Sequence, residues 1–323
     1  MSAVTPIDLP VDNATERQLS RGQKALTATN KTKRRLTSRG ATIAALIIAV
    51  LWTTPTLGLF ISSFRPAEEV SRTGWWTIFQ NPGFTFDNYT EVLQAGNSTL
   101  TLAGSFFNSI AITIPATVFP LVIASLAAYA FAWIDFRGKN WLFIGVFALQ
   151  IVPLQMALVP LLSLFSRGLT VGGVELFSGL DASGSYSQVW IAHTIFALPL
   201  AIFLLHNFVS EIPRELIEAA RVDGAGHGQI FFRIVLPLTM PAIASFAIFQ
   251  FLWVWNDLLV ALVFADGAVA PMTKLLAEIT GNRGQDWHLL TAGAFVSILV
   301  PLIVFFSLQR YFVRGLLAGS TKG

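Results

Sequence analysis

Residues 218–237 read EAARVDGAGHGQIFFRIVLP, and they lie in a polar break between two long apolar runs. The stretch opens with Glu218-Ala219-Ala220, reaches Gly224 after three residues, and reaches Ile234-Val235-Leu236-Pro237 after nine more. Glycine permits backbone turns, whereas the prolines at 237 and 241 break or kink a helix. The implied shape is a helix, a turn and a second helix, presented between apolar segments.

The first of these helices is expected over Arg214–Val222. Pro213 has a fixed φ that suits a first helical position, and the nine residues after it contain neither glycine nor proline. Gly224 is the expected stop. Apolar residues recur within the helix at a spacing of four, and the pattern predicts a narrow apolar ridge formed by Ile212, Leu216 and Ala220, with Ala219 beside it and with Glu215, Glu218 and Arg221 as flanks. A ridge made partly of alanine fits a tight groove.

This stretch and three others resemble segments of a known family. The run Ile212–Ala225, IPRELIEAARVDGA, resembles the EAA loop of permease subunits of ABC importers, and carbohydrate importers in particular. Ser125–Phe131, SLAAYAF, is similar to the corresponding segment of the same subunits. Trp255-Asn256-Asp257, and Gly315-Leu316 with Lys322-Gly323, look like their counterparts in MalG-like subunits of maltose and α-glucoside importers. The resemblance covers residues 41–323.

The resemblance implies an all-α integral membrane protein with six transmembrane helices and the type I ABC importer permease fold. It also implies that the helix at 214–222 docks in a cleft of a cytoplasmic ATPase. Glu218 would be a charged contact, Ala219 and Ala220 the small faces that permit insertion, Gly224 the turn, and Asp223 its cap. The full docking set is Glu218, Ala219, Ala220, Asp223, Gly224, Ile234, Leu236 and Pro237.

The partners follow from the same resemblance. They are a second permease subunit in a heterodimer, two cytoplasmic ABC ATPase subunits and an extracytoplasmic sugar-binding protein. This chain would bind no cofactor, because ATP and Mg are used by the partner ATPase. No G-x-x-x-x-G-K-[ST] occurs, since Gly138-Lys139-Asn140 lacks both the upstream glycine and the hydroxyl residue.

Composition favours a lipid environment. Hydrophobic residues make up 54% of the 323 residues and charged residues only 12%, about half the share of a soluble domain. The net charge of +3 and the absence of a basic stripe argue against nucleic-acid binding. The chain has no cysteine and hence neither disulfides nor thiolate metal sites.

Six apolar segments reach the length of about 20 residues that a membrane helix needs. They lie near 41–64, 108–133, 141–165, 188–209, 241–264 and 288–312. The predicted organisation is a polar cytoplasmic N-terminal tail over 1–40, a permease domain over 41–313 with its EAA loop at 210–240, and a cytoplasmic C-terminal tail over 314–323. The basic cluster before the first segment resembles a signal peptide, but the segment is long and lacks a clear cleavage site, which favours an uncleaved span.

Lys and Arg residues predict the orientation, because they concentrate in cytoplasmic loops. With both termini inside, the inner segments hold 16 of the 21 Lys and Arg residues. Eight of these lie in 1–40, so the inner count still leads without the tail, by 8 to 5. A multi-pass protein of the cell membrane is expected, with both termini and Glu218 in the cytoplasm.

The three outer connections carry other features. In the first, Trp75 and Trp76 either anchor at the membrane interface or contact a partner. The second is rich in glycine, with Gly172, Gly173, Gly179 and Gly184. The third, near 265–287, lies where the resemblance places contact with a binding protein.

No catalytic constellation or zinc-ligand spacing is found, and structural or helix-terminal roles are favoured for the four histidines. Polar residues inside spans are costly and therefore informative. Asn256 and Asp257 are candidates for the translocation path, with hydrogen bonding between helices as the equal alternative. Structural bonding is favoured for Gln150, Gln155, His193 and Gln250.

The leading hypothesis is a non-catalytic permease subunit of an ATP-driven importer that translocates an oligosaccharide or a disaccharide. The alternative is a secondary transporter driven by an ion gradient, which would require paired charges deep in the spans or an internal repeat. A membrane-embedded enzyme or scaffold is a third class, and it lacks an acid, base or nucleophile cluster.

Overall fold

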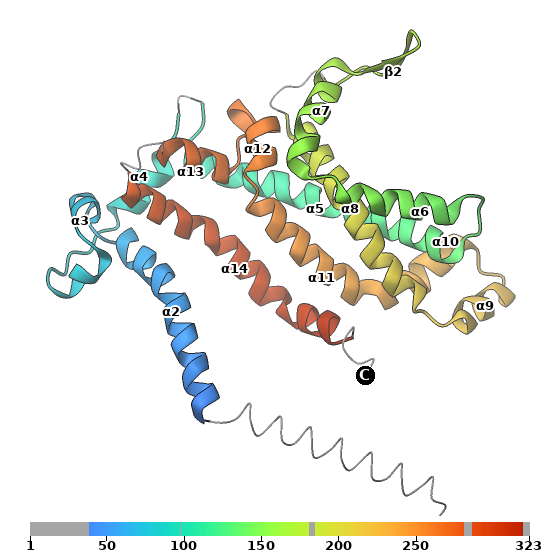
Figure 1. Ribbon diagram of the computed structural model, residues 1–323, viewed down its shortest axis with the longest axis horizontal. Coiled ribbons are helices and arrows are strands. Elements are labelled where there is room, and N and C mark those ends of the chain that lie inside the picture. Colours follow the sequence, from blue (N-terminus) through green and yellow to red (C-terminus); the bar gives the residue numbers. More distant parts are fainter. Residues whose placement is uncertain (1–38, 98, 181–184, 281–285, 319–323) are drawn as a thin grey trace, which may run out of the picture. The chain divides into compact units, whose positions relative to one another are not determined.

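The computed structural model describes residues 39–97, 99–180, 185–280 and 286–318 (Figure 1). The chain divides into two compact units, Met1–Leu59 and Phe60–Gly323. In the first unit the described residues form the greater part of helix α2, Arg39–Ser63. The expected N-terminal tail up to residue 38, together with Gly184 and Lys322-Gly323, lies outside the described residues.

The second unit is almost entirely helical. Its elements, in chain order, are α3 Ala67–Arg72, η1 Trp75–Phe79, α4 Asp87–Gln94, α5 Leu102–Trp133, α6 Lys139–Ala148, η2 Leu149–Ile151, α7 Leu154–Arg167, β1 Leu169–Val171, β2 Val174–Phe177, α8 Tyr186–Ser210, α9 Arg214–Val222, α10 His227–Ile230, the π-helical turn η3 Phe231–Val235, α11 Leu236–Trp255, α12 Leu259–Phe264, η4 Gly267–Val269, α13 Met272–Thr280 and α14 Trp287–Ala318.

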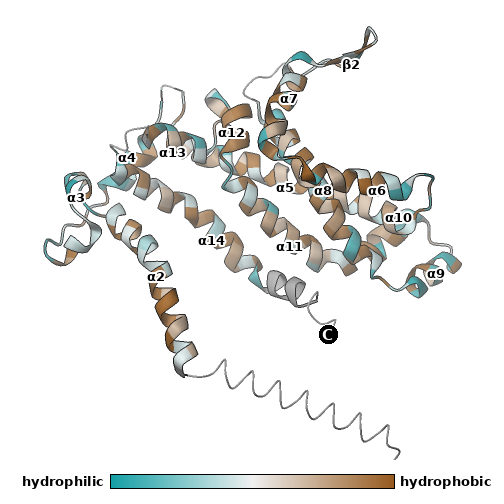
Figure 2. Cartoon of the chain, in the orientation of Figure 1, coloured by the Kyte–Doolittle hydropathy of each residue, from teal (hydrophilic) through white to brown (hydrophobic). Residues whose placement is uncertain are grey.

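The all-α membrane fold is confirmed. Among the described residues, five helices are long and apolar enough to cross a membrane: Gly40–Ser63, Leu102–Trp133, Tyr186–Ser210, His227–Trp255 and Trp287–Gln309. A sixth crossing is provided if the bent pair Lys139–Ile151 and Leu154–Arg167 counts as one span. Brown, apolar residues follow these helices in Figure 2, as lipid-facing segments require.

Two of the expected spans differ in the structure. The segment expected at 141–165 is broken between Ile151 and Leu154, where its two halves meet at 106°. Pro153 lies in this break and has no N–H with which to continue a helix. The span expected at 241–264 instead begins at His227 and ends at Trp255, and α12 follows as a separate short helix.

The prolines of the apolar segments differ in whether they interrupt a helix. Helix α5 continues through Pro115 and Pro120, whereas the chain breaks at Pro153. A break or a kink is expected at Pro237 and Pro241, and the chain does not break there, because both residues lie within one continuous span. The π-helical turn over 231–235 ends two residues before Pro237, at the start of α11.

Small buried residues allow the long helices of the second unit to pack closely. On α5, Ala116, Ala124 and Ala128 are fully buried, and they contact α8 and α11. Another side of α5 carries an exposed apolar stripe with a spacing of four, formed by Ile114, Val118, Val122 and Leu126. In a membrane such a stripe faces lipid or a second subunit.

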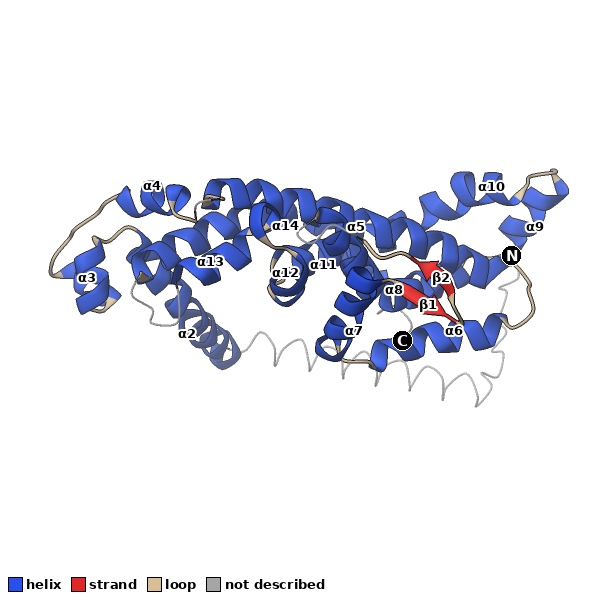
Figure 3. Ribbon diagram, turned by 90° about the horizontal axis from the view of Figure 1, so that it is seen from above, coloured by secondary structure: helices blue, strands red, loops and turns tan. Residues whose placement is uncertain are grey.

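The connections are more ordered than simple loops. Arg65 is buried and holds the first one together through Thr73 and Thr77. Trp76 is exposed there, so its anchoring and partner-contact roles both stay open. In the second, Gly172 and Gly173 both have positive φ and close a two-stranded hairpin, red in Figure 3, which a Gly-Gly pair permits.

The third connection contains α13, which packs on α5 and α14. Asn108 of α5 donates from Nδ2 to the carbonyls of Ala268 and Ala270, at 2.8 and 3.0 Å. Lys274 is buried, and its ammonium donates to the Ala265 carbonyl and to Asp266. The hydrogen bond from Lys274 lowers the pKa of Asp266, whose carboxylate is therefore stabilised in its charged form.

Candidate functional site

Helix α9 spans Arg214–Val222, as the sequence predicts. Pro213 precedes it as the N-cap, with a ψ of 133°, and so lies one residue before the expected first helical position. The helix is amphipathic, and teal and brown residues alternate along it in Figure 2. It is preceded directly by the end of α8 and followed by α10, which also lies near it in Figures 1 and 3.

Gly224 ends the helix through a Schellman turn. The Gly224 N–H donates to the Arg221 carbonyl at 3.0 Å, and the Ala225 N–H donates to the Ala220 carbonyl at 2.9 Å. Gly224 has φ +81°, a left-handed conformation that costs other residues about 1–2 kcal/mol. Asp223 occupies the C-cap, in agreement with its expected place at the turn.

The two faces of α9 have separate environments, and the expected ridge does not lie on one face, because Ile212 is buried and Ala220 half-buried while Leu216 is exposed. Ile217, not Leu216, is the buried side chain, at 1% exposure, and it joins the core cluster that also contains Ile212. Leu216 is instead exposed. The sequence could not settle this, because apolar residues occur on both sides of the helix. The outward apolar face therefore includes Leu216 and Val222, the latter 87% exposed.

The residues of the predicted docking set, five on α9 or its turn and three in the span that follows, differ in exposure. Those with exposed side chains are Glu218, Ala219, Asp223, Gly224 and Pro237, and those that are half-buried are Ala220, Ile234 and Leu236. The three half-buried residues pack against the same core cluster as Ile217. The helix thus presents Glu218 and Ala219 outward, while Ala220 supports its attachment to the chain.

Helix α9 and the segment after it are fixed to the end of α5. Arg221 donates from Nη2 to the Trp133 carbonyl at 3.2 Å. The Tyr129 hydroxyl lies 2.9 Å from Nδ1 of His227, and the Tyr129 ring packs edge-on against Phe231. The sequence favours a structural role for His227 but does not identify its partner. The Ser125–Phe131 segment was the signal that could have identified it, because Tyr129 of that segment makes the contact.

A polar cavity of about 320 Å³ lies beside α9. It is bounded by the end of α5, the start of α6 and the end of α8, and its charged or titratable lining residues are Asp135, Lys139, His206, Arg214, Glu218 and Arg221. Lys139 and Asp135 are paired at 3.5 Å. Charged side chains of both signs therefore surround the base of α9, as expected at a water-exposed end of a helical bundle.

The site lies at the opposite end of α5 from α13. Asn108 contacts the segment before α13, whereas Trp133 contacts α9. At 1.5 Å per residue, the helix between them is about 38 Å long. This exceeds a hydrocarbon core of about 30 Å, so the two contacts are on opposite faces of a membrane that α5 crosses.

The two translocation-path candidates have different surroundings. Asn256 is exposed, and its amide donates to the Leu252 carbonyl at 2.7 Å. Asp257 is almost buried and accepts from the backbone N–H groups of Val260 and Ala261, at 3.0 and 3.2 Å. His193 of α8 lies 3.8 Å away from its carboxylate. Sequence reasoning considered His193 and Asp257 separately and did not predict this contact, which joins distant segments.

Comparisons with known proteins agree with this geometry. The family model described as "Binding-protein-dependent transport system inner membrane component" matches residues 120–317. The osmoprotective compounds uptake permease protein GgtD of Synechocystis sp. is 53% identical over 286 residues, which cover 87% of this chain and 91% of that protein.

The alpha-glucoside transport system permease protein AglG of Rhizobium meliloti is 53% identical over 251 residues, covering 77% of this chain and 63% of that protein. A solved bacterial ABC transporter involved in alginate import contains a chain with a TM-score of 0.63 and 18% identity, covering 94% of this chain and 100% of that one. At that identity the structural match supports the fold alone.

Proposed function

Because this chain belongs to the family of binding-protein-dependent transport system inner membrane components, and is a non-catalytic permease subunit of an ATP-driven sugar importer, we propose that α9 transmits the conformational change of the ATPase to the membrane helices. The ATPase is a separate subunit. The observation that carries the proposal is the division of α9 into a buried face at Ile217 and an outward face at Leu216, Ala219 and Val222.

The outward face suits insertion into a groove. Ala219 adds little bulk, and Glu218 beside it supplies a charge for a basic partner group. The inward face suits force transmission, since Ile217 is packed in a core that includes residues of α5, α8 and α11. Movement of α9 would therefore displace three membrane helices together. Packed cores respond to such displacement by switching between discrete arrangements.

The proposed assembly contains this chain, a second permease subunit, two cytoplasmic ATPase subunits and an extracytoplasmic sugar-binding protein. ATP and Mg would act only in the ATPase subunits. The proposed orientation has both termini and α9 in the cytoplasm of the cell, in keeping with the excess of Lys and Arg in the inner segments. The cargo proposed is a disaccharide or a short oligosaccharide, with α-glucosides as the leading class.

Reconstitution tests this function. The complete complex is placed in proteoliposomes, and uptake of radiolabelled maltose, trehalose and sucrose is measured with and without the binding protein and enclosed ATP. We expect uptake to require both and to persist when an ionophore collapses ion gradients. Uptake that needs a gradient but no ATP would instead identify a secondary transporter.

Orientation is tested separately with an introduced thiol. The chain has no cysteine, so Ala219→Cys creates its only thiol. A membrane-impermeant maleimide added to intact cells should leave this thiol unlabelled and should label it after the membrane is opened. Labelling in intact cells would place α9 outside and exclude contact with a cytoplasmic ATPase.

A further inference from the structure

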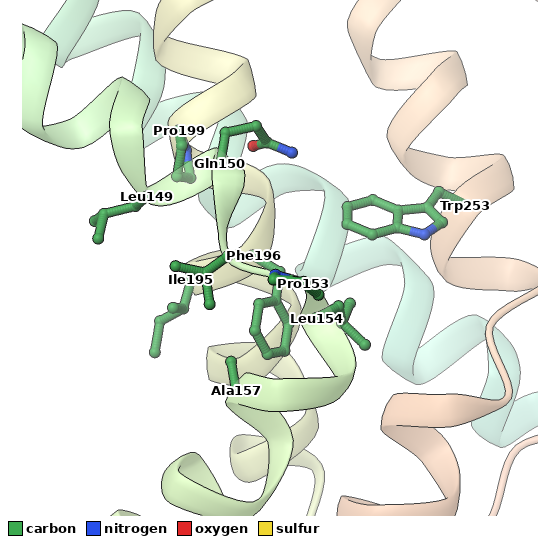
Figure 4. A pocket seen from close by; sticks show the side chains of 10 residues that line it. Leu149, Gln150, Pro153, Leu154, Ala157, Ile195, Phe196, Pro199 and Trp253 are labelled. Atoms are coloured by element: carbon green, nitrogen blue, oxygen red, sulfur yellow. The ribbon is translucent and has the colours of Figure 1, made fainter.

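A cavity of about 350 Å³ lies where the broken α6–α7 segment faces α8 and α11 (Figure 4). Its lining is largely apolar and consists of Leu149, Gln150, Val152, Pro153, Leu154, Ala157, Ile195, Phe196, Pro199 and Trp253. Gln150 and the indole of Trp253 carry its side-chain polar groups. The Gln150 amide extends toward the side of the cavity on which Trp253 lies (Figure 4).

The backbone around this cavity also offers polar groups. The helix that ends at Ile151 leaves terminal carbonyls without regular helical donors. In α8, Pro199 lacks the N–H that would otherwise donate to the Ile195 carbonyl, and both residues line the cavity. Irregular backbone at membrane depth is tolerated where it lines a cavity that satisfies it. The break thus makes an apolar space with hydrogen-bonding capacity.

This combination fits a carbohydrate. A sugar ring has apolar C–H faces that pack on an indole, and hydroxyls that donate to carbonyls and bond with an amide. Ligand cavities begin at about 300 Å³, so this one accommodates a single ring or a disaccharide unit rather than a long chain. An acyl chain would fill the apolar part but would leave the Gln150 amide and the backbone carbonyls without partners.

We infer that this permease subunit itself contacts the transported sugar in the α6–α7 break, with Trp253 as the stacking surface and Gln150 as the hydroxyl-binding group. The inference rests on the proposed function and adds to it a site within this chain. Discontinuous membrane helices form substrate sites in other transporters for the same reason, because their breaks expose backbone groups.

Thiol protection tests the inference. In the complete transporter, Ala157→Cys gives this chain a single thiol in the cavity, and Gln155→Cys gives a matched thiol on the exposed side of α7. A small hydrophilic methanethiosulfonate reagent is applied with and without the panel sugar that the wild-type complex takes up fastest. We expect sugar to slow modification at position 157 at least about fivefold, and to leave position 155 unchanged.

A second pair of variants separates sugar contact from structural damage. Trp253→Ala should lower sugar uptake about tenfold, equivalent to about 1.4 kcal/mol, while ATP hydrolysis stimulated by the loaded binding protein stays within twofold. Trp253→Phe keeps an aromatic face and should retain most of the uptake. Unchanged uptake in Trp253→Ala, or equal losses of uptake in Trp253→Ala and Trp253→Phe, would contradict a stacking contact between Trp253 and the sugar.

The outcomes distinguish this inference from the function on which it rests. If the wild-type complex imports a sugar with ATP but that sugar protects neither position, the cavity is not a sugar site and the importer function stands. Protection at both positions equally would reflect a global rearrangement and would also overturn the inference. If the wild-type complex imports no panel sugar with ATP, the proposed function fails and the inference fails with it.

Discussion

The hydroxyl of Tyr129, near the end of α5, lies 2.9 Å from Nδ1 of His227, at the start of the span that follows α9. This contact joins α5 to α10, the helix that follows the Gly224 turn. The Tyr129 ring also packs against Phe231, in the same span. Together with the Arg221–Trp133 bond, the Tyr129–His227 contact makes α9 part of the helical bundle rather than a free loop.

Tyr129→Phe removes the hydroxyl and keeps the ring. We expect uptake per ATP hydrolysed to fall about fivefold, because a coupling loss of about 1 kcal/mol corresponds to that factor. The measurement is simultaneous uptake and phosphate release in proteoliposomes. Leu126→Ala, on the exposed stripe of the same helix, is the control. An unchanged ratio in Tyr129→Phe would show that the bond does not transmit force.

Gly224 is needed for its left-handed backbone, not for space, since a Cβ placed there would meet no described atom within 4 Å. We expect Gly224→Asp to abolish uptake while the chain still reaches the membrane, and Gly224→Asn to retain more uptake because asparagine tolerates positive φ better than most residues. Gly226→Ala is the control, because Gly226 has φ −75° and similarly open surroundings. Unimpaired uptake in Gly224→Asp would contradict the role assigned to the turn.

The two faces of α9 should respond to substitution in opposite ways. Ala219→Trp adds bulk on the outward face, so it should prevent co-purification of the ATPase and leave the melting temperature of the permease pair unchanged. Ile217→Ala removes a buried side chain and should lower that melting temperature, since such changes cost about 2–5 kcal/mol. Retained ATPase binding in Ala219→Trp would place the docking surface elsewhere.

Substitutions of Asp257 and Asn256 should change the stability of the protein by different amounts. Asp257→Ala removes the acceptor for two N–H groups of α12 and should destabilise the protein by about 0.5–2 kcal/mol. Asn256→Ala removes one exposed hydrogen bond and should change stability by less than about 0.5 kcal/mol. Thermal unfolding of the purified complex measures both. A loss of uptake in Asn256→Ala with normal stability would support its place on the translocation path.

Two arginines of the first connection provide a further comparison. Arg65 is 1% exposed and donates to the hydroxyls of Thr73 and Thr77, at 2.6 and 2.9 Å. Arg65→Met should therefore destabilise the protein by about 1.5–3 kcal/mol, the range for hydrogen bonds to a charged group. Arg72 is 77% exposed and meets Glu68 only at 4.0 Å, so Arg72→Met should have an effect below about 0.5 kcal/mol. Similar melting temperatures for the two variants would contradict this reading of the connection.

Local features of the sequence determined much of the candidate site. The helix at 214–222 and its end at Gly224 follow from helix propensity and backbone conformation, which depend on neighbouring residues. The membrane fold follows from the length and composition of apolar runs. The sequence could not determine which face of α9 is buried, because Leu216 and Ile217 are both apolar and adjacent.

Only the tertiary structure decided the features that join distant segments. Pro115, Pro120 and Pro153 are alike in sequence, but α5 continues through the first two and the chain breaks at the third. Whether a helix survives a proline depends on whether its neighbours replace the lost hydrogen bond. The His193–Asp257 contact and the cavity at Gln150 likewise arise from side chains of segments that are distant in the sequence. The sequence by itself determined the family and most of the membrane helices, and packing between helices decided where the chain breaks and which side chains meet.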